Sequence, residues 1–138
     1  MASGKYKSGR IAVMRGQIDF VNDAIGALLI DADLYSVDLD TDLGLSDIPD
    51  AAILSNTVLT GKSLDETEVT LFADPLIFLN VPVSTEEKSA TAVVLFLDKE
   101  DYSDCILIAY FDDLAGFPVE PDDTDITVNW DAEGILIG

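Results

Sequence analysis

The sequence predicts an all-β fold: an antiparallel, jelly-roll-like β-sandwich that carries an extended N-terminal arm. Short apolar or alternating runs recur along the chain, turn signals separate them, and long amphipathic helical patterns are almost absent. Of the 138 residues, 49% are hydrophobic, which is enough for one domain with a substantial core. We therefore expect a β-sandwich domain over residues 25–138 and a segment of different character over residues 1–24.

The N-terminal segment differs from the rest of the chain in charge. Four of the seven basic residues lie in the first 16 positions, and none of the 27 acidic residues does. Residues 1–10 are small, polar and basic, which predicts a flexible arm that becomes ordered on contact with a partner. Residues 10–24 are ambiguous between a short helix and an extended segment. Four apolar residues approach helical spacing, although Gly16 interrupts them: Ile11, Met14, Ile18 and Val21.

The expected strands follow in order. They lie at residues 25–31, 51–61, 68–74, 75–83, 90–99, 104–113 and 125–130, and a final apolar run closes the chain. The segment 90–113 is expected to form the central hairpin because its two strands are nearly unbroken apolar runs. In the last long strand Ile126, Val128 and Trp130 alternate with Thr127 and Asn129, which predicts one buried and one exposed face.

The composition argues against several functional classes. There is no histidine, and Cys105 is the single cysteine, so the commonest general base and an intramolecular disulfide are both excluded. No phosphate-binding glycine loop or nucleophile–base arrangement is evident, so we expect neither catalysis nor a cofactor. A net charge of −20 argues against nucleic acid and anionic membranes as partners. No apolar run approaches the roughly 20 residues that span a bilayer, which favours a soluble protein.

Two acidic clusters are weak candidates for cation sites. Asp38, Asp40 and Asp42 alternate as at the start of a calcium loop. However, the sixth and twelfth positions, where an EF-hand needs glycine and glutamate, are Leu43 and Pro49. We therefore favour a solvated, self-repelling loop over a cation site, within a loop over residues 31–50 that has one helical turn near Ser46. The cluster at residues 120–125 is interpreted as a turn leading into the strand that follows.

Three stretches resemble a family of small structural proteins of tailed-bacteriophage heads, the decoration or cement proteins. The first is KYKSGRIAVMRGQIDFVNDAIGALLI, the second is LIAYFDD at residues 107–113, and the third is ITVNWDAEGILIG at the end of the chain. The positions that carry the resemblance are Lys5, Tyr6, Gly16, Ile18, Asp19, Phe20, Asp23, Ile126, Val128, Trp130, Ala132, Gly134, Ile135 and Leu136. Together the three stretches cover about 45 residues, in the family's order.

The resemblance implies a jelly-roll-like protein on the outside of a virion, clamping the major capsid protein lattice after assembly in the host cytoplasm. A homodimer or homotrimer is expected, because capsid sites at symmetry axes favour closed oligomers. We expect the capsid contacts in the arm, with Tyr6 inserted into the partner and four basic residues around it: Lys5, Lys7, Arg10 and Arg15. The alternatives are a tail, baseplate or head-fibre component, or a β-sandwich module that binds calcium or carbohydrate.

Overall fold

A five-stranded antiparallel sheet forms the centre of the molecule. The computed structural model describes residues 4–35, 37–42, 44–67, 70–81, 89–99, 105–112, 117, 119–130 and 135–137. Its central sheet has the order β1-β8-β7-β2-β3. The strands are β1 (Gly4–Lys5), β8 (Ile106–Phe111), β7 (Ala92–Leu97), β2 (Ile25–Ile30) and β3 (Ile53–Val58).

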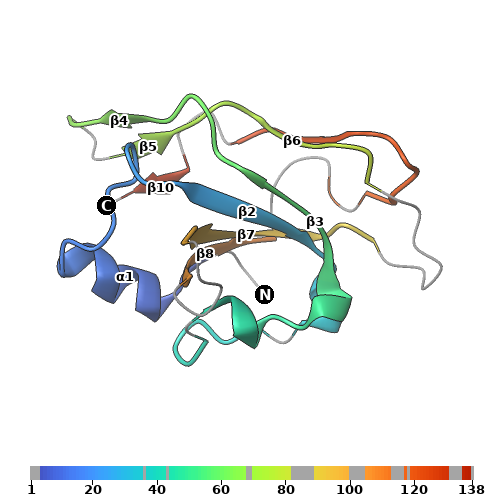
Figure 1. Cartoon of the computed structure of the whole chain (residues 1–138), viewed down its shortest axis with the longest axis horizontal. Coiled ribbons are helices and arrows are strands. Elements are labelled where there is room, and N and C mark those ends of the chain that lie inside the picture. The colour runs from blue at the N-terminus through green and yellow to red at the C-terminus, as the bar shows by residue number, and fades with distance from the viewer. Residues whose placement is uncertain are drawn as a thin grey trace.

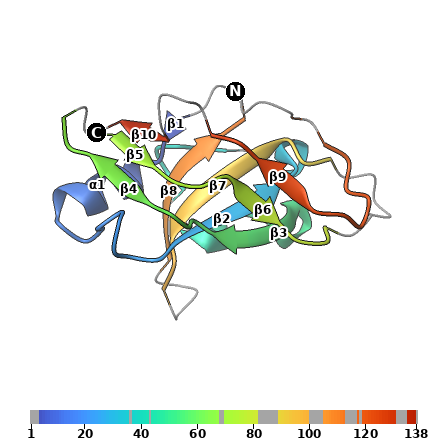
Figure 2. The same cartoon turned by 90° about the horizontal axis from the view of Figure 1, so that it is seen from above.

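Two smaller antiparallel sheets complete the β-structure that is described. One has the order β10-β5-β4, formed by β10 (Leu136–Ile137), β5 (Thr70–Phe72) and β4 (Ser63–Asp65). The other pairs β6 (Leu76–Phe78) with β9 (Ile126–Val128). Both lie over the same face of the central sheet (Figures 1 and 2). The prediction of a mostly β, antiparallel fold is confirmed.

The first hydrophobic core fills the space between the central sheet and the two smaller sheets. Ile25, Ala27 and Leu29, which alternate along β2, belong to this cluster together with Phe78 of β6 and Val128 of β9. As the sequence pattern predicted, Ile126 and Val128 are buried while Thr127 is exposed. Burial of this much apolar surface between two layers is the main force that holds the fold together.

A second core lies on the opposite face of the central sheet. Leu28 and Phe96 of the sheet cluster there with Tyr35, Leu45 and Ile48. The last three belong to the segment that follows β2, which forms three short 3-10 turns: η1 (Ala32–Leu34), η2 (Leu45–Asp47) and η3 (Asp50–Ala52). The segment has a turn at Ser46 and exposed side chains at Asp38 and Asp40, as expected. The expectation of a solvated loop is wrong for the buried apolar residues of the segment. Apolar residues between the aspartates cover the sheet, and β2 is buried on both faces, as predicted.

The predicted central hairpin is present. β7 pairs with β8 in antiparallel register, with Val93 opposite Phe111 and Leu95 opposite Ala109. All six residues of β7 are buried, because this strand lies between β8 and β2 and has a core on each face. Cys105, just before β8, is also buried, which confirms its interpretation as a small core residue.

The N-terminal segment is part of this architecture. β1 pairs with β8, and the helix α1 (Lys7–Met14) packs against β8 as well. The expectation of a flexible arm over residues 1–10 is therefore wrong for residues 4–10. The helix begins earlier than the apolar spacing indicated, and its buried residues are Gly9 and Ala12, whereas Ile11 and Met14 face outward. No helix among the described residues has the length and apolar character needed to cross a membrane.

Candidate partner-binding surface

Tyr6 attaches the N-terminal segment to the second core. Its side chain has no solvent exposure, and its hydroxyl lies 2.8 Å from the Tyr35 hydroxyl. The Tyr35 hydroxyl in turn donates to Asp42 Oδ2 over 2.5 Å. Because the single Tyr35 proton is used toward Asp42, Tyr6 is the donor to Tyr35. A chain of three polar groups, of which the two tyrosines are buried, therefore connects the N-terminal segment to the acidic segment after β2.

This burial corrects the role expected for Tyr6. A ring with no exposed surface cannot insert into a pocket of another protein. Tyr6 instead fills a place in the core of its own chain, where a large aromatic side chain contributes strongly to stability. The argument from positive charge for a contact with a partner does not involve Tyr6. It applies to the four basic residues of this segment: Lys5, Lys7, Arg10 and Arg15.

Backbone contacts fix the position of α1 on β8. The Tyr6 amide donates to the Ile108 carbonyl over 2.9 Å, the Lys7 amide to the Leu39 carbonyl over 2.7 Å, and Ser8 Oγ to the Leu107 carbonyl over 3.0 Å. Gly9 brings the two backbones together: a Cβ at this position would lie 2.8 Å from Ile108 Cα and 2.9 Å from the Leu107 carbonyl oxygen. The helix therefore sits directly on the strand.

A glycine ends α1 sharply. Gly16 has a φ of +72°, a conformation that favours glycine, and its amide donates to the Val13 carbonyl over 3.0 Å. The Gln17 amide donates to the Ala12 carbonyl over 2.9 Å. These two bonds are those of a Schellman motif, which satisfies carbonyls at a helix C-terminus. Gly16, which interrupted the apolar spacing in the sequence, marks the end of the helix.

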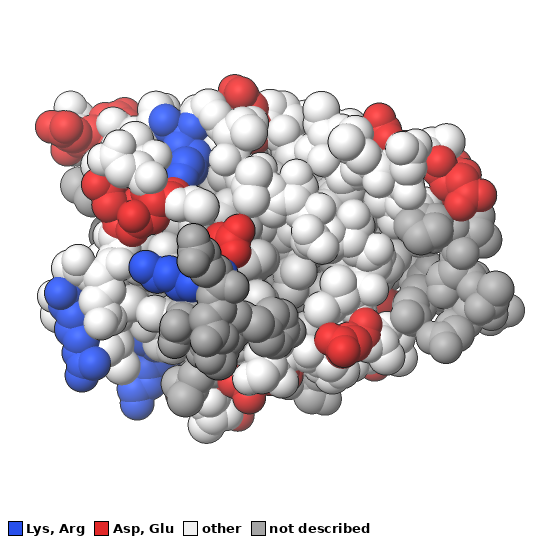
Figure 3. All heavy atoms as spheres, in the orientation of Figure 1, with Lys and Arg blue, Asp and Glu red and all other residues white. Residues whose placement is uncertain are grey.

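The outward face of α1 combines positive charge with exposed apolar side chains. Lys7, Arg10, Ile11 and Met14 follow the three- and four-residue spacing that places them on one side of a helix. Met14 is 89% exposed, and Arg15 lies at the C-terminal end of the same helix. All the basic side chains visible in Figure 3 lie in the half of the molecule that contains α1 (Figures 1 and 3). We call Lys7, Arg10, Ile11, Met14 and Arg15 the basic helix face.

Two of the three aspartates considered as cation ligands, Asp38 and Asp42, accept hydrogen bonds from their own segment. Asp38 Oδ1 accepts from the Asp40 and Thr41 amides over 3.0 and 3.1 Å. A hydrogen bond from the Thr41 side chain is the largest cause of the lowered pKa of Asp38, and the two amide bonds lower this pKa further. Asp42 Oδ2 accepts from the Asp38 amide over 3.0 Å besides the Tyr35 hydroxyl. Among the described residues, no group of three or more Asp, Glu, Cys or His side chains is arranged to hold a metal ion.

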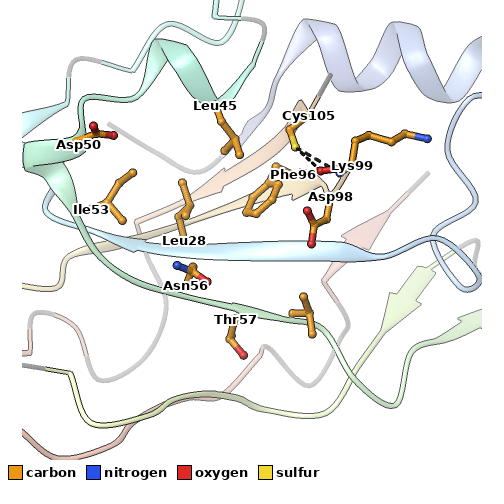
Figure 4. A pocket seen from close by; sticks show the side chains of 11 residues that line it. Leu28, Leu45, Asp50, Ile53, Asn56, Thr57, Phe96, Asp98, Lys99 and Cys105 are labelled. Atoms are coloured by element: carbon orange, nitrogen blue, oxygen red, sulfur yellow. Dashed lines mark hydrogen bonds between the residues drawn. The ribbon is translucent and has the colours of Figure 1, made fainter. Parts of the chain in front are cut away.

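A groove of about 320 Å³ lies beside β3, on the side of the second core. Figure 4 shows Leu28, Leu45 and Phe96 forming its apolar walls. Cys105 is at one end, where its Sγ accepts from the Lys99 amide over 3.3 Å. Asp50 and Asp98 also line the groove, without a histidine or a second cysteine that would make it a nucleophilic site.

The comparison with known proteins identifies no relative. No protein-family model matches this chain, and no curated protein matches it.

Buried tyrosines predict a loss of stability at alkaline pH. Burial raises the pKa of Tyr6 and Tyr35 well above its ordinary value, and burial, together with Asp112, raises the pKa of Tyr110 to about 12. Unfolded tyrosines lose their protons near pH 10, so above that pH the unfolded state binds fewer protons and the free energy of unfolding falls. The stabilising contribution is complete below about pH 10.

Above about pH 10, each tyrosine that is protonated in the folded state but not in the unfolded state lowers the free energy of unfolding by about 1.4 kcal/mol per pH unit. Urea unfolding between about pH 9 and about pH 11 measures this slope. We expect Tyr35→Phe to make the slope shallower than in the wild type. Identical slopes in the two proteins would show that Tyr35 titrates alike in the folded and unfolded states.

Proposed function

We propose that this chain is a bacteriophage capsid decoration protein, which binds the outer surface of the major capsid protein lattice and stabilises the head without catalysis. It works on the exterior of the virion after assembly in the host bacterial cytoplasm. The central sheet, faced by two smaller sheets across the first core, supports a jelly-roll-like sandwich as its architecture. The resemblance of the two ends of the sequence and of the β8 segment to decoration proteins supports the choice of class.

The basic helix face is the observation that carries the proposal. The chain has a net charge of −20, yet α1 presents Lys7, Arg10 and Arg15 around the exposed side chain of Met14. A surface of this kind is suited to an acidic, partly apolar patch on a partner, because charge complementarity speeds association and apolar contact holds it. The acidic remainder, with most of the net charge, keeps the protein soluble until it meets the shell.

The rigid attachment of α1 strengthens this argument. A side chain on a fixed helix loses less conformational freedom on binding than one on a flexible arm. Hydrogen bonds from Tyr6, Lys7 and Ser8 hold the helix on the body in the free protein. Many copies on one shell would then bind by repeated use of the same small surface, so each contact can be weak while the lattice is clamped.

Charge reversal at Arg10 tests this proposal. We expect Arg10→Glu to weaken co-sedimentation with expanded capsid shells by at least about tenfold, since it places a negative charge in the middle of the basic helix face. The double substitution Thr127→Glu/Asn129→Glu is the matched control. It changes the net charge by the same amount at two exposed positions in and just after β9, far from α1 (Figures 1 and 2).

Circular dichroism and thermal melting should show that both variants remain folded, because all three side chains are exposed. Shell binding lost in Arg10→Glu and retained in the control supports the basic helix face as the contact. Equal binding by both variants and the wild type would contradict it.

A further inference from the structure

We infer that β3 is a self-association edge, at which two copies of this chain pair antiparallel across a two-fold axis. β3 is the last strand of the central sheet, and β2 pairs with one of its sides. At the opposite end of the sheet, β1 has only two residues. β3 therefore presents the longer of the two edges of the central sheet. This inference concerns the partner of β3 and does not depend on the proposed function.

The direction of the backbone groups along β3 follows from its pairing with β2. The Leu59 amide donates to the Ile25 carbonyl over 2.8 Å, and Thr57 lies opposite Ala27 two residues earlier. Residues 55, 57 and 59 therefore direct their amides and carbonyls toward β2, whereas Asn56 and Val58 direct theirs away from it. Among the described residues, the outward backbone groups of Asn56 and Val58 make no hydrogen bond.

An outward edge of this kind is usually protected, because it can pair with a strand of another chain. Charged side chains and proline are common protections. Residues 51–61 contain neither, although 25% of the whole chain is charged. The irregularity in the β2–β3 pairing lies at Leu29 and Ile30, so the later part of β3 pairs regularly. Asn56 is exposed, and Val58 is 46% exposed.

The absence of charge favours a second copy as the occupant. With 27 acidic residues, the chain has many surfaces that suit a basic partner, but β3 is not one of them. An uncharged edge suits a partner of like charge, since it lets two acidic bodies approach without facing carboxylates. Figure 3 shows an uncharged region in the middle of the face that β3 crosses in Figure 1. A second copy of the chain, which has the same net charge of −20, is a partner of like charge.

The geometry also limits the register to pairs of outward-facing residues, and we place the axis at Asn56. Residues whose backbone groups point outward exchange hydrogen bonds with each other in an antiparallel pair, so a two-fold axis at Asn56 places Asn56 opposite its own copy. The central sheets of the two copies then join into one continuous sheet. Salt screens the repulsion between two copies at −20, so dimerisation is expected to strengthen as ionic strength rises.

Analytical ultracentrifugation of the full chain, with Asn56→Lys as the variant, tests this inference. Lysine at this position places two ammonium groups opposite each other across the axis, and we expect the dimer dissociation constant to rise by at least about tenfold. Thr127→Lys is the control: it adds the same charge at an exposed position of β9, which β6 separates from β3 in Figure 2. That variant should dimerise like the wild type.

Amide hydrogen exchange provides a second measurement that does not depend on a variant. In the wild-type dimer the Asn56 and Val58 amides should be protected, and their protection should fall on dilution. A wild-type chain that stays monomeric at high salt and high concentration would overturn the inference. So would a trimer, which a two-fold strand pair cannot produce, or an equal effect of Asn56→Lys and Thr127→Lys.

Discussion

Replacement of Tyr6 by alanine is expected to lower the free energy of unfolding by about 3–5 kcal/mol, the range for removing a large aromatic side chain from a core. The ring is fully buried among the residues of the second core, so its loss leaves a cavity that the sheet backbone cannot close. The substitution also removes the donor to Tyr35. Urea unfolding followed by circular dichroism measures the change.

Tyr6→Phe is the matched comparison, because it keeps the ring and removes only the hydroxyl. We expect a loss of about 1 kcal/mol, the usual net value of one hydrogen bond, since Tyr35 still donates to Asp42. A flexible N-terminal arm would behave differently. If Tyr6→Ala unfolds at the same urea concentration as the wild type, residues 4–10 are not part of the folded body.

Gly9→Ala is expected to destabilise the protein by about 1–3 kcal/mol, the usual cost of forcing extra atoms into a packed interface. The added Cβ would meet Ile108 Cα and the Leu107 carbonyl oxygen at less than 3 Å. These are backbone atoms of β8, in the centre of the molecule, so the helix has to move away from the strand. Thermal melting measures the stability, and hydrogen exchange of the Tyr6 amide reports whether α1 has moved.

Gly16→Ala provides a contrast at the other end of α1. A Cβ at Gly16 meets no atom within 4 Å, so its cost arises only from the positive φ of +72°. It should leave the Tyr6 amide as protected as in the wild type, whereas Gly9→Ala should lower that protection. Equal protection of the Tyr6 amide in both variants would contradict the close contact at Gly9.

The strands with continuous or alternating apolar residues could be predicted from the sequence. β2 and β7 are buried on both faces, and Ile126 and Val128 alternate with an exposed threonine in β9. β4 was not predicted, because its three residues, Ser-Leu-Asp, are mostly polar and lie at the edge of a small sheet. Periodicity detects a strand by what it buries, and a short edge strand buries little.

The positive charge of the candidate site could be predicted from the sequence, but the helix that carries it and the way this helix packs could not. The cluster of basic residues near the N-terminus is evident from the sequence. The docking of α1 is not, because the contact with β8 is made by Gly9 and Ala12 instead of large apolar residues. Local signals for the helix are weak: its first turn contains no acidic residue, and Tyr6 provides no side-chain cap. Tertiary contacts therefore determine this helix.

The connection between Tyr6 and Tyr35 also lies beyond sequence reasoning. The two hydroxyls meet across 29 positions of the chain, and only the fold brings them together. Within residues 31–50, the aspartates suggested exposure, while Leu45 and Ile48 are buried in the second core. The burial of these two residues could have been predicted from a periodic apolar pattern. A 3-10 turn of three residues is too short to show such a pattern.

Quantitative mass spectrometry of purified virus particles, assembled from the genome that encodes this chain, tests the proposed function most directly. The amount of the chain is compared with that of the major capsid protein. A decoration protein occupies repeated sites over the whole shell, so we predict copies on the order of hundreds per particle, lost together when Arg10→Glu replaces the wild type. A dozen or fewer copies, or none, would contradict a function on the capsid lattice.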